Sequence, residues 1–262
     1  MVEVSPLLLF SGVGMVSVGL LAWIWWAPRA RFRFFLYGGL LWAAAIAVKL
    51  VMDLTVTQPF SQQLSTAVGQ GLLASVTLGL YVGLRTGLLE CGFPYVAALM
   101  TRLREAAWRE VFAVGLGFGA FEAVLLGVQS LLNVATIMLN PSVLDSLPPG
   151  QREAVVRQLS YGAAVVPAPI LERAFTLVAH LFATVLAVYA AKASKLSLLA
   201  ASILYKTVLD GPIPIFGYVV PERGLLELYL IEAYLGALAL VAALGLFWFR
   251  KRSVDSSEPG LP

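Results

Sequence analysis

The stretch VFAVGLGFGAFEAVLLGVQSLLNVATIM, residues 111–138, decides the fold class of this chain. Glu122 is its only ionisable residue. A helix needs about 20 mostly apolar residues to cross the hydrocarbon core of a bilayer, and this stretch exceeds that length. The sequence therefore predicts a transmembrane helix here.

The composition of the whole chain agrees with this prediction. Of its 262 residues, 60% are hydrophobic and 13% are charged. Soluble domains carry about 25% charged residues, and a single soluble core of this size cannot remove so much apolar surface from water. A net charge of +3 is also too small for an electrostatic footprint on nucleic acid. The composition thus excludes a soluble enzyme, a disordered protein and a nucleic-acid-binding domain.

Seven apolar stretches are predicted to span the bilayer, which gives an all-α, polytopic transmembrane helix bundle, with six or eight spans as alternatives. The predicted spans are 6–26, 34–54, 67–89, 111–138, 170–191, 196–210 and 225–249. The segment 86–101 either continues the third span or forms a short separate helix. A polar loop with four prolines is expected at 140–167, and a turn-rich segment at 211–224. Residues 1–252 are expected to form a single transmembrane helical domain, and residues 253–262 a disordered cytoplasmic tail.

The loop charges predict the orientation, because cytoplasmic loops of membrane proteins carry an excess of Lys and Arg. With the N-terminus outside, the inner side receives Arg29, Arg31, Arg33, Arg102, Arg104, Arg109, Lys192, Lys195, Arg250, Lys251 and Arg252. The outer loops then hold only Arg152, Arg157 and Arg223. We therefore expect a multi-pass protein of a bacterial or archaeal inner membrane, in contact with the lipid bilayer, with the C-terminus in the cytoplasm.

Several ionisable residues lie inside the predicted spans, where each costs about 2.5–3.5 kcal/mol on insertion scales. Lys49 and Asp53 are four residues apart, as are Lys206 and Asp210, so each pair shares one helical face. We interpret Lys49 and Asp53 as an intrahelical pair near the outer surface. Glu122 has no cation within four residues on its own helix, so it needs a partner from another helix or a proton.

His180, the only histidine, also lies in the middle of a predicted span. Burial cost alone therefore predicts one polar centre built by the third to the sixth span.

Four segments carry a family resemblance. They read GLLECGFPY at 87–95, GLGFGAFEA at 115–123, LERAFTLVAH at 171–180 and ILYKTVLDG at 203–211. In this order they resemble the YhfC family of intramembrane metalloproteases, which is related to the CAAX-prenyl-protease-like (CPBP) membrane peptidases. In that family one helix carries Glu-Glu-x-x-Arg and the next carries Gly-x-Gly-His-Gly-Gly-x-Glu. Later helices supply Glu-Arg…His and His-x-x-x-Asp/Asn. The resemblance implies a helical bundle whose glutamates activate water and bind metal, and whose histidines hold a divalent metal, zinc above all.

The chain departs from this pattern at four positions. Cys91 stands at the second glutamate, Pro94 at the arginine, Phe118 at the histidine of the glycine-rich segment, and Lys206 at the histidine of His-x-x-x-Asp. The polar residues that remain from the family's set are Glu90, Glu122, Glu172, His180 and Asp210.

A catalytic zinc needs three protein ligands and a water. His180, Glu122 and Asp210 would supply three, and Cys91 would substitute for a carboxylate. Lys206, however, places an ammonium about one helical turn from Asp210, where it would repel the metal. We interpret Lys206 as having taken over the charge role of the metal, within a buried polar centre that also holds Glu172, Arg173 and Cys91.

Three functions follow as hypotheses. The first is a pseudoprotease without a cofactor, a partner or scaffold subunit among other membrane proteins. It rests on the replaced ligands and on two small-residue faces, Gly115/Gly119 and Ala183/Ala187/Ala190. The second is an active zinc metallopeptidase with Glu90 or Glu122 as general base and His180 and Asp210 as ligands. The third is a proton-coupled transporter, although the sequence shows no inverted repeats.

Overall fold

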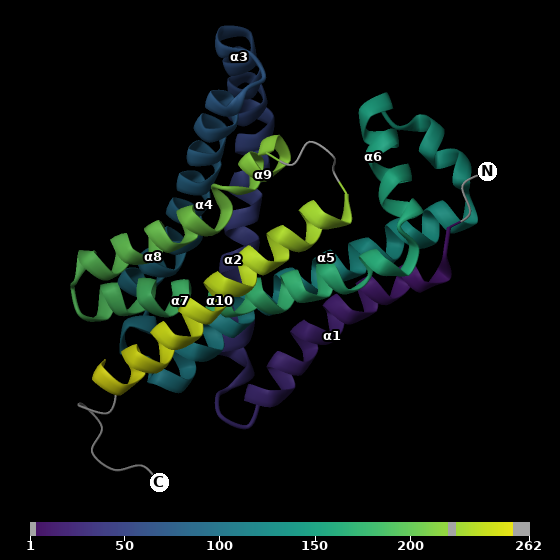
Figure 1. The fold of residues 1–262 in the computed structure, drawn as a ribbon. Coiled ribbons are helices and arrows are strands. Elements are labelled where there is room, and N and C mark those ends of the chain that lie inside the picture. The colour runs from purple at the N-terminus through teal and green to yellow at the C-terminus, as the bar shows by residue number, and fades with distance from the viewer. Residues whose placement is uncertain (1–3, 220–223, 254–262) are drawn as a thin grey trace.

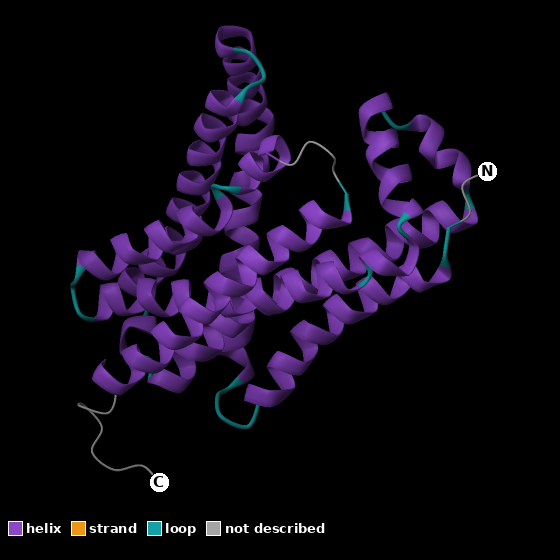
Figure 2. Cartoon of the chain, viewed as in Figure 1, coloured by secondary structure: helices purple, strands orange, loops and turns teal. Residues whose placement is uncertain are grey.

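The computed structural model describes residues 4–219 and 224–253, and every regular element in these ranges is a helix (Figures 1 and 2). The long helices are α1 (Leu9–Trp26), α2 (Phe32–Met52), α4 (Leu72–Met100), α5 (Trp108–Leu139), α7 (Pro167–Lys192), α8 (Leu196–Asp210) and α10 (Leu225–Ser253). The shorter α-helices are α3 (Gln58–Val68), α6 (Pro149–Ser160) and α9 (Ile213–Val219). The all-α prediction is confirmed.

Seven helical segments are long and apolar enough to cross a membrane: Pro6–Arg29, Phe32–Val68, Leu72–Met100, Trp108–Leu139, Gly162–Lys192, Leu196–Val219 and Leu225–Arg252. The prediction of about seven spans is therefore confirmed. The orientation stays a prediction, and the predicted outer residue Arg223 lies outside the described residues, as does the predicted tail from residue 254 onward.

The second and third spans differ in length from the prediction. Helix α2 continues through a π-helical turn, Asp53–Thr57, into α3 and ends only at Val68. Gly69, at φ +73°, terminates it in a conformation that favours glycine. The third span consequently begins at Leu72, and the predicted start at residue 67 was wrong. Helix α4 continues without a break to Met100, so 86–101 is the end of this span, with Pro94 buried inside it.

Two segments expected to be loops also contain helices. The predicted polar loop at 140–167 holds α6, which begins at Pro149, where a missing backbone N–H costs nothing. Its Leu159 packs with Leu144 and Val165 in a small apolar cluster, and this burial explains why the segment is ordered. The turn-rich segment after α8 contains α9.

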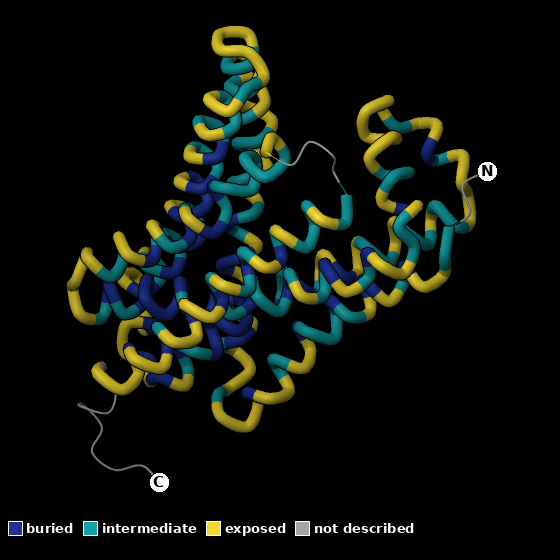
Figure 3. The backbone as a smooth tube through the Cα atoms, in the orientation of Figure 1, coloured by how far each residue is buried: buried dark blue, intermediate teal, exposed yellow. Residues whose placement is uncertain are grey.

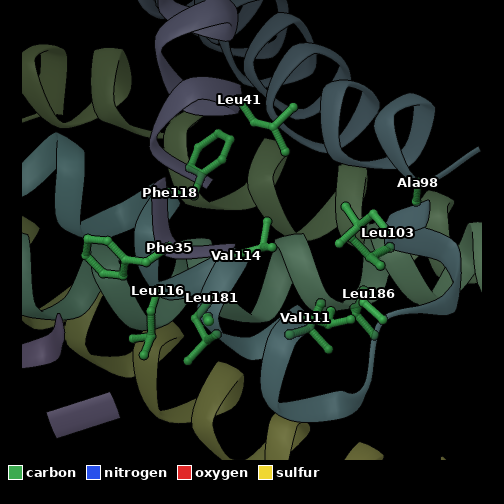
Figure 4. Close-up of a cluster of buried hydrophobic side chains, with 14 of the residues drawn as sticks. Phe35, Leu41, Ala98, Leu103, Val111, Val114, Leu116, Phe118, Leu181 and Leu186 are labelled. Atoms are coloured by element: carbon green, nitrogen blue, oxygen red, sulfur yellow. The ribbon is translucent and has the colours of Figure 1, made fainter. Parts of the chain in front are cut away.

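Helices α5 and α7 form the centre of the bundle. In the most apolar part of each span, 61% of the residues are buried for α5 and 72% for α7, against 22–28% for the other five spans. Figure 3 shows the buried residues gathered where the helices cross, with exposed residues on the outer faces. Phe118, Val114 and Leu181 belong to the main cluster of buried apolar side chains (Figure 4).

Glycines allow α5 and α7 to approach closely. A Cβ at Gly119 would lie 2.9 Å from Leu177 Cα and 3.3 Å from His180 Cβ, and one at Gly115 would lie 3.0 Å from Leu181 Cα. These separations are shorter than ordinary van der Waals contacts, so a larger side chain would push the helices apart. The predicted packing face at Gly115 and Gly119 is confirmed, and it brings Glu122 of α5 toward His180 of α7.

Candidate functional site

The carboxylate of Glu90, on α4, lies at the centre of a buried ionic network. Its side chain is 4% exposed. Oε1 lies 2.6 Å from Lys49 Nζ on α2, and Oε2 lies 2.9 Å from Lys206 Nζ on α8. The Lys206 contact is an ion pair rather than an aligned hydrogen bond. Two cations from two other helices thus neutralise one buried carboxylate.

The expected pair between Lys49 and Asp53 does not form. Lys49 binds Glu90 instead, and Asp53 forms an ion pair with Arg85 of α4, which also donates a hydrogen bond to Thr57 at 2.8 Å. The reason is burial. Glu90 is almost fully buried and loses more free energy without a cation than Asp53, whose side chain is 42% exposed.

Glu122, on α5, binds partners from α2 and α7. Arg173 forms an ion pair with Oε1. Oε2 accepts a hydrogen bond from Trp42 Nε1 at 2.9 Å and lies 2.7 Å from His180 Nε2. The prediction that the partner of Glu122 comes from another helix is confirmed. Arg173 also pairs with its neighbour Glu172.

His180 joins the two glutamates. Its Nε2 faces Glu122, and its Nδ1 lies 3.5 Å from Glu90 Oε2. The ring of Phe118 packs beside the imidazole, with 5.1 Å between ring centroids. An apolar ring therefore occupies this side of the histidine.

Lys206 is the most deeply buried cation of the network, with a side chain only 2% exposed. Besides Glu90, it lies 3.5 Å from Asp210 Oδ2, so the predicted pair four residues apart on α8 forms. Cys91, also fully buried, packs with Ala183 and Ala187.

The contribution of α2 to the polar centre was not predicted. The polar centre was predicted to come from the third to the sixth span, yet α2 contributes both Lys49 and Trp42. The sequence did indicate that Lys49 needs a partner, because an unpaired lysine inside a span costs free energy. The prediction assigned it Asp53, the nearer acidic residue in sequence.

The donor set does not fit a metal ion. Among the residues that the structure describes, no group of three or more His, Cys, Asp or Glu side chains is arranged to hold one. All four carboxylate oxygens of Glu90 and Glu122 already face lysine, arginine, tryptophan or histidine nitrogens of the chain.

The small-residue face of Ala183, Ala187 and Ala190 does not offer a contact surface for another subunit. Ala183, Ala187 and Ala190 are at most 3% exposed inside the bundle. They pack the helices of this chain together and leave no free surface for another subunit.

The comparison with known families agrees with this layout. The sequence profile of the YhfC intramembrane metalloprotease family matches residues 13–235, well over half of the chain. The chain belongs to this family, as the resemblance predicted, and it is a multi-pass integral membrane protein. No curated protein and no solved structure matches it.

Proposed function

We propose that this member of the YhfC family is a pseudoprotease, which has kept the buried polar centre of a metallopeptidase and works by binding in the membrane rather than by catalysis. One observation carries the proposal. Lys206 Nζ lies among Glu90, 2.9 Å away, and Asp210, 3.5 Å away, where it supplies the positive charge that a metal would bring.

Electrostatics supports this reading. Within the network the carboxylates are Glu90, Glu122, Glu172 and Asp210, and the cations are Lys49, Arg173 and Lys206. These cations already neutralise most of the acidic charge. A divalent ion added beside two or three fixed cations at low dielectric would be repelled strongly.

The glutamates are also poorly placed to act as a base. A general base needs a free oxygen within hydrogen-bond reach of the proton that it abstracts. Glu90 is held from both sides by ammonium groups, and Glu122 by Arg173 and the Trp42 N–H. Activation of water would first require these partners to leave, which exposes unpaired buried charge.

The second candidate function is an active zinc metallopeptidase. It is favoured by one observation, the convergence of Glu90, His180 and Glu122, which are the residues that the family resemblance singles out. It requires Lys206 and Arg173 to turn away from the carboxylates when the metal enters. This requirement is the reason that we place it second.

The geometry argues against a proton-coupled transporter. The exposed ends of the network are Glu172 and Asp210, with side chains 38% and 32% exposed. Helices α7 and α8 are joined by the short connection 193–195, and both carboxylates lie toward the helix ends away from it. Both residues lie inside their spans, Gly162–Lys192 and Leu196–Val219, on the side of His180 and Lys206 away from this connection. This arrangement does not favour a relay from one membrane face to the other.

The test of the proposed function is proteolysis in cells. New protein N-termini would be compared between membranes that contain the wild type, Glu122→Gln, His180→Ala, or the control Glu153→Gln, whose exposed carboxylate in α6 pairs with Arg157 and not with the network. We expect the same set of termini in all four. Cleavage products present with the wild type and the control, and lost in both network variants, would establish the active metallopeptidase instead.

A further inference from the structure

A basic and aromatic cavity lies at one end of the bundle, away from the ionic network. Its volume is about 490 Å³. It is formed where the end of α1, the start of α5 and the end of α10 meet, and its walls include Trp25, Trp26, Arg29, Trp108, Arg109 and Arg250.

The three arginines of this cavity have no acidic partner in the part of the chain that the structure describes. Arg29, Arg109 and Arg250 are all exposed, and within residues 4–219 and 224–253 none of them forms an ion pair with an Asp or Glu. Glu110, which follows Arg109 in sequence, accepts a hydrogen bond from Ala107 N at 3.0 Å. Within the described residues, the cavity therefore carries three positive charges that no acidic side chain pairs with.

The aromatic side chains make a fixed wall for these charges. Trp26 is buried and stacks on Phe112, with 4.0 Å between centroids, while its Nε1 donates a hydrogen bond to the carbonyl of Arg109 at 3.0 Å. The guanidinium of Arg29 lies over the rings of Trp25 and Trp26, 5.5 and 5.4 Å from their centroids. Stacking on two rings limits the orientations that this guanidinium can take.

The position along the membrane normal points to the ligand. Arg29 ends the first span, Trp108 begins the fourth, and Arg252, two residues after Arg250, ends the seventh. The cavity therefore lies at the depth of the lipid headgroups, where tryptophan is enriched. Phe112 and Phe247 add apolar surface next to the charges.

We propose that this cavity binds the phosphate of an anionic phospholipid. The planar fork of a guanidinium matches two phosphate oxygens, and basic pockets between transmembrane helices suit lipid headgroups. The apolar wall accommodates the first carbons of the acyl chains, which a free phosphate lacks. The proposal does not depend on the catalytic status of the protein or on its orientation.

The experiment is a lipid titration by native mass spectrometry of the purified full chain in detergent. The titrants are phosphatidylglycerol, phosphatidylcholine and inorganic phosphate. The test variant is R29Q/R109Q/R250Q, and the control R31Q/R33Q/R102Q removes the same charge from the same end of the bundle without touching the cavity.

We expect the wild type and the control to prefer phosphatidylglycerol, and the test variant to bind it roughly a hundredfold more weakly, since each basic group near an anionic lipid adds about a factor of five. An equal loss in the control would overturn the proposal in favour of a general surface attraction. Equal binding of phosphatidylcholine by the wild type, or full displacement of the lipid by inorganic phosphate, would overturn it too.

A second variant distinguishes a specific loss of lipid binding from misfolding. R29K/R109K/R250K keeps all three charges and loses only the guanidinium forks. It should bind phosphatidylglycerol more weakly than the wild type, whereas R31K/R33K/R102K should not. Equal binding by both lysine variants and the wild type would contradict a phosphate held by the arginines.

Discussion

Lys206 Nζ lies 2.9 Å from Glu90 Oε2, across the contact between α8 and α4. Both side chains are almost fully buried, so neither charge is stabilised by water. This ion pair joins two residues that are 116 positions apart in sequence. In the resemblance to the family pattern, Glu90 stands at the first glutamate and Lys206 at the histidine of His-x-x-x-Asp. The proposed replacement of a metal ion by an ammonium group depends on this pair.

Lys206→Met should destabilise the protein strongly, because it leaves Glu90 and Asp210 short of a cation in a buried site. We expect a loss of about 3–5 kcal/mol in the free energy of unfolding. Denaturation in detergent, followed by circular dichroism, would measure it. The control Arg152→Met breaks an exposed ion pair with Asp145 and should cost less than about 1 kcal/mol. Similar losses in the two variants would show that the Lys206 pair contributes little.

The partner of Lys49 can be identified by double-mutant cycles. Lys49→Met and Glu90→Gln should be coupled by about 0.5–3 kcal/mol in unfolding free energy, since their side chains are 2.6 Å apart. Lys49→Met and Asp53→Asn should be additive, because Asp53 pairs with Arg85. The reverse result would support the intrahelical pair that the spacing suggested.

Gly119→Ala should disturb the contact between α5 and α7. The added Cβ would lie 2.9 Å from Leu177 Cα, a backbone atom that cannot move alone, so we expect a loss of about 1–3 kcal/mol. Gly92→Ala is the matched control, because nothing lies within 4 Å of the added carbon and alanine favours the helix. Thermal unfolding of the two variants should therefore move in opposite directions. A stable Gly119→Ala protein would mean that the helices are packed less closely than described.

The fold was largely predictable from the sequence because its main signal is local. An apolar run such as 111–138 needs no knowledge of its neighbours to be recognised as a span. The ends of the helices were harder to predict. Helix α2 continues to Val68 through a polar segment, which lies beyond the length needed to cross a bilayer and so gives no signal in the apolar pattern. Helix α6 depends on apolar contacts made by Leu159 with distant residues.

The site was predictable only in part. The pair of Lys206 and Asp210 follows from helical spacing, and the cross-helix partner of Glu122 follows from the cost of burial. The identity of that partner, Arg173, and the contribution of α2 depend on which helices meet. A single sequence does not contain that information, and the rule that prefers the nearest opposite charge failed at Lys49.

Zinc content most directly tests the central claim that an ammonium has replaced the metal. The variant F118H/K206H restores both missing histidines beside His180, whereas F118H alone adds one histidine and keeps the ammonium. After equilibration with zinc and removal of the excess, elemental analysis should find close to one zinc ion per chain in the double variant and no stoichiometric zinc in the wild type or in F118H. Stoichiometric zinc in the wild type, lost on His180→Ala, would contradict the account.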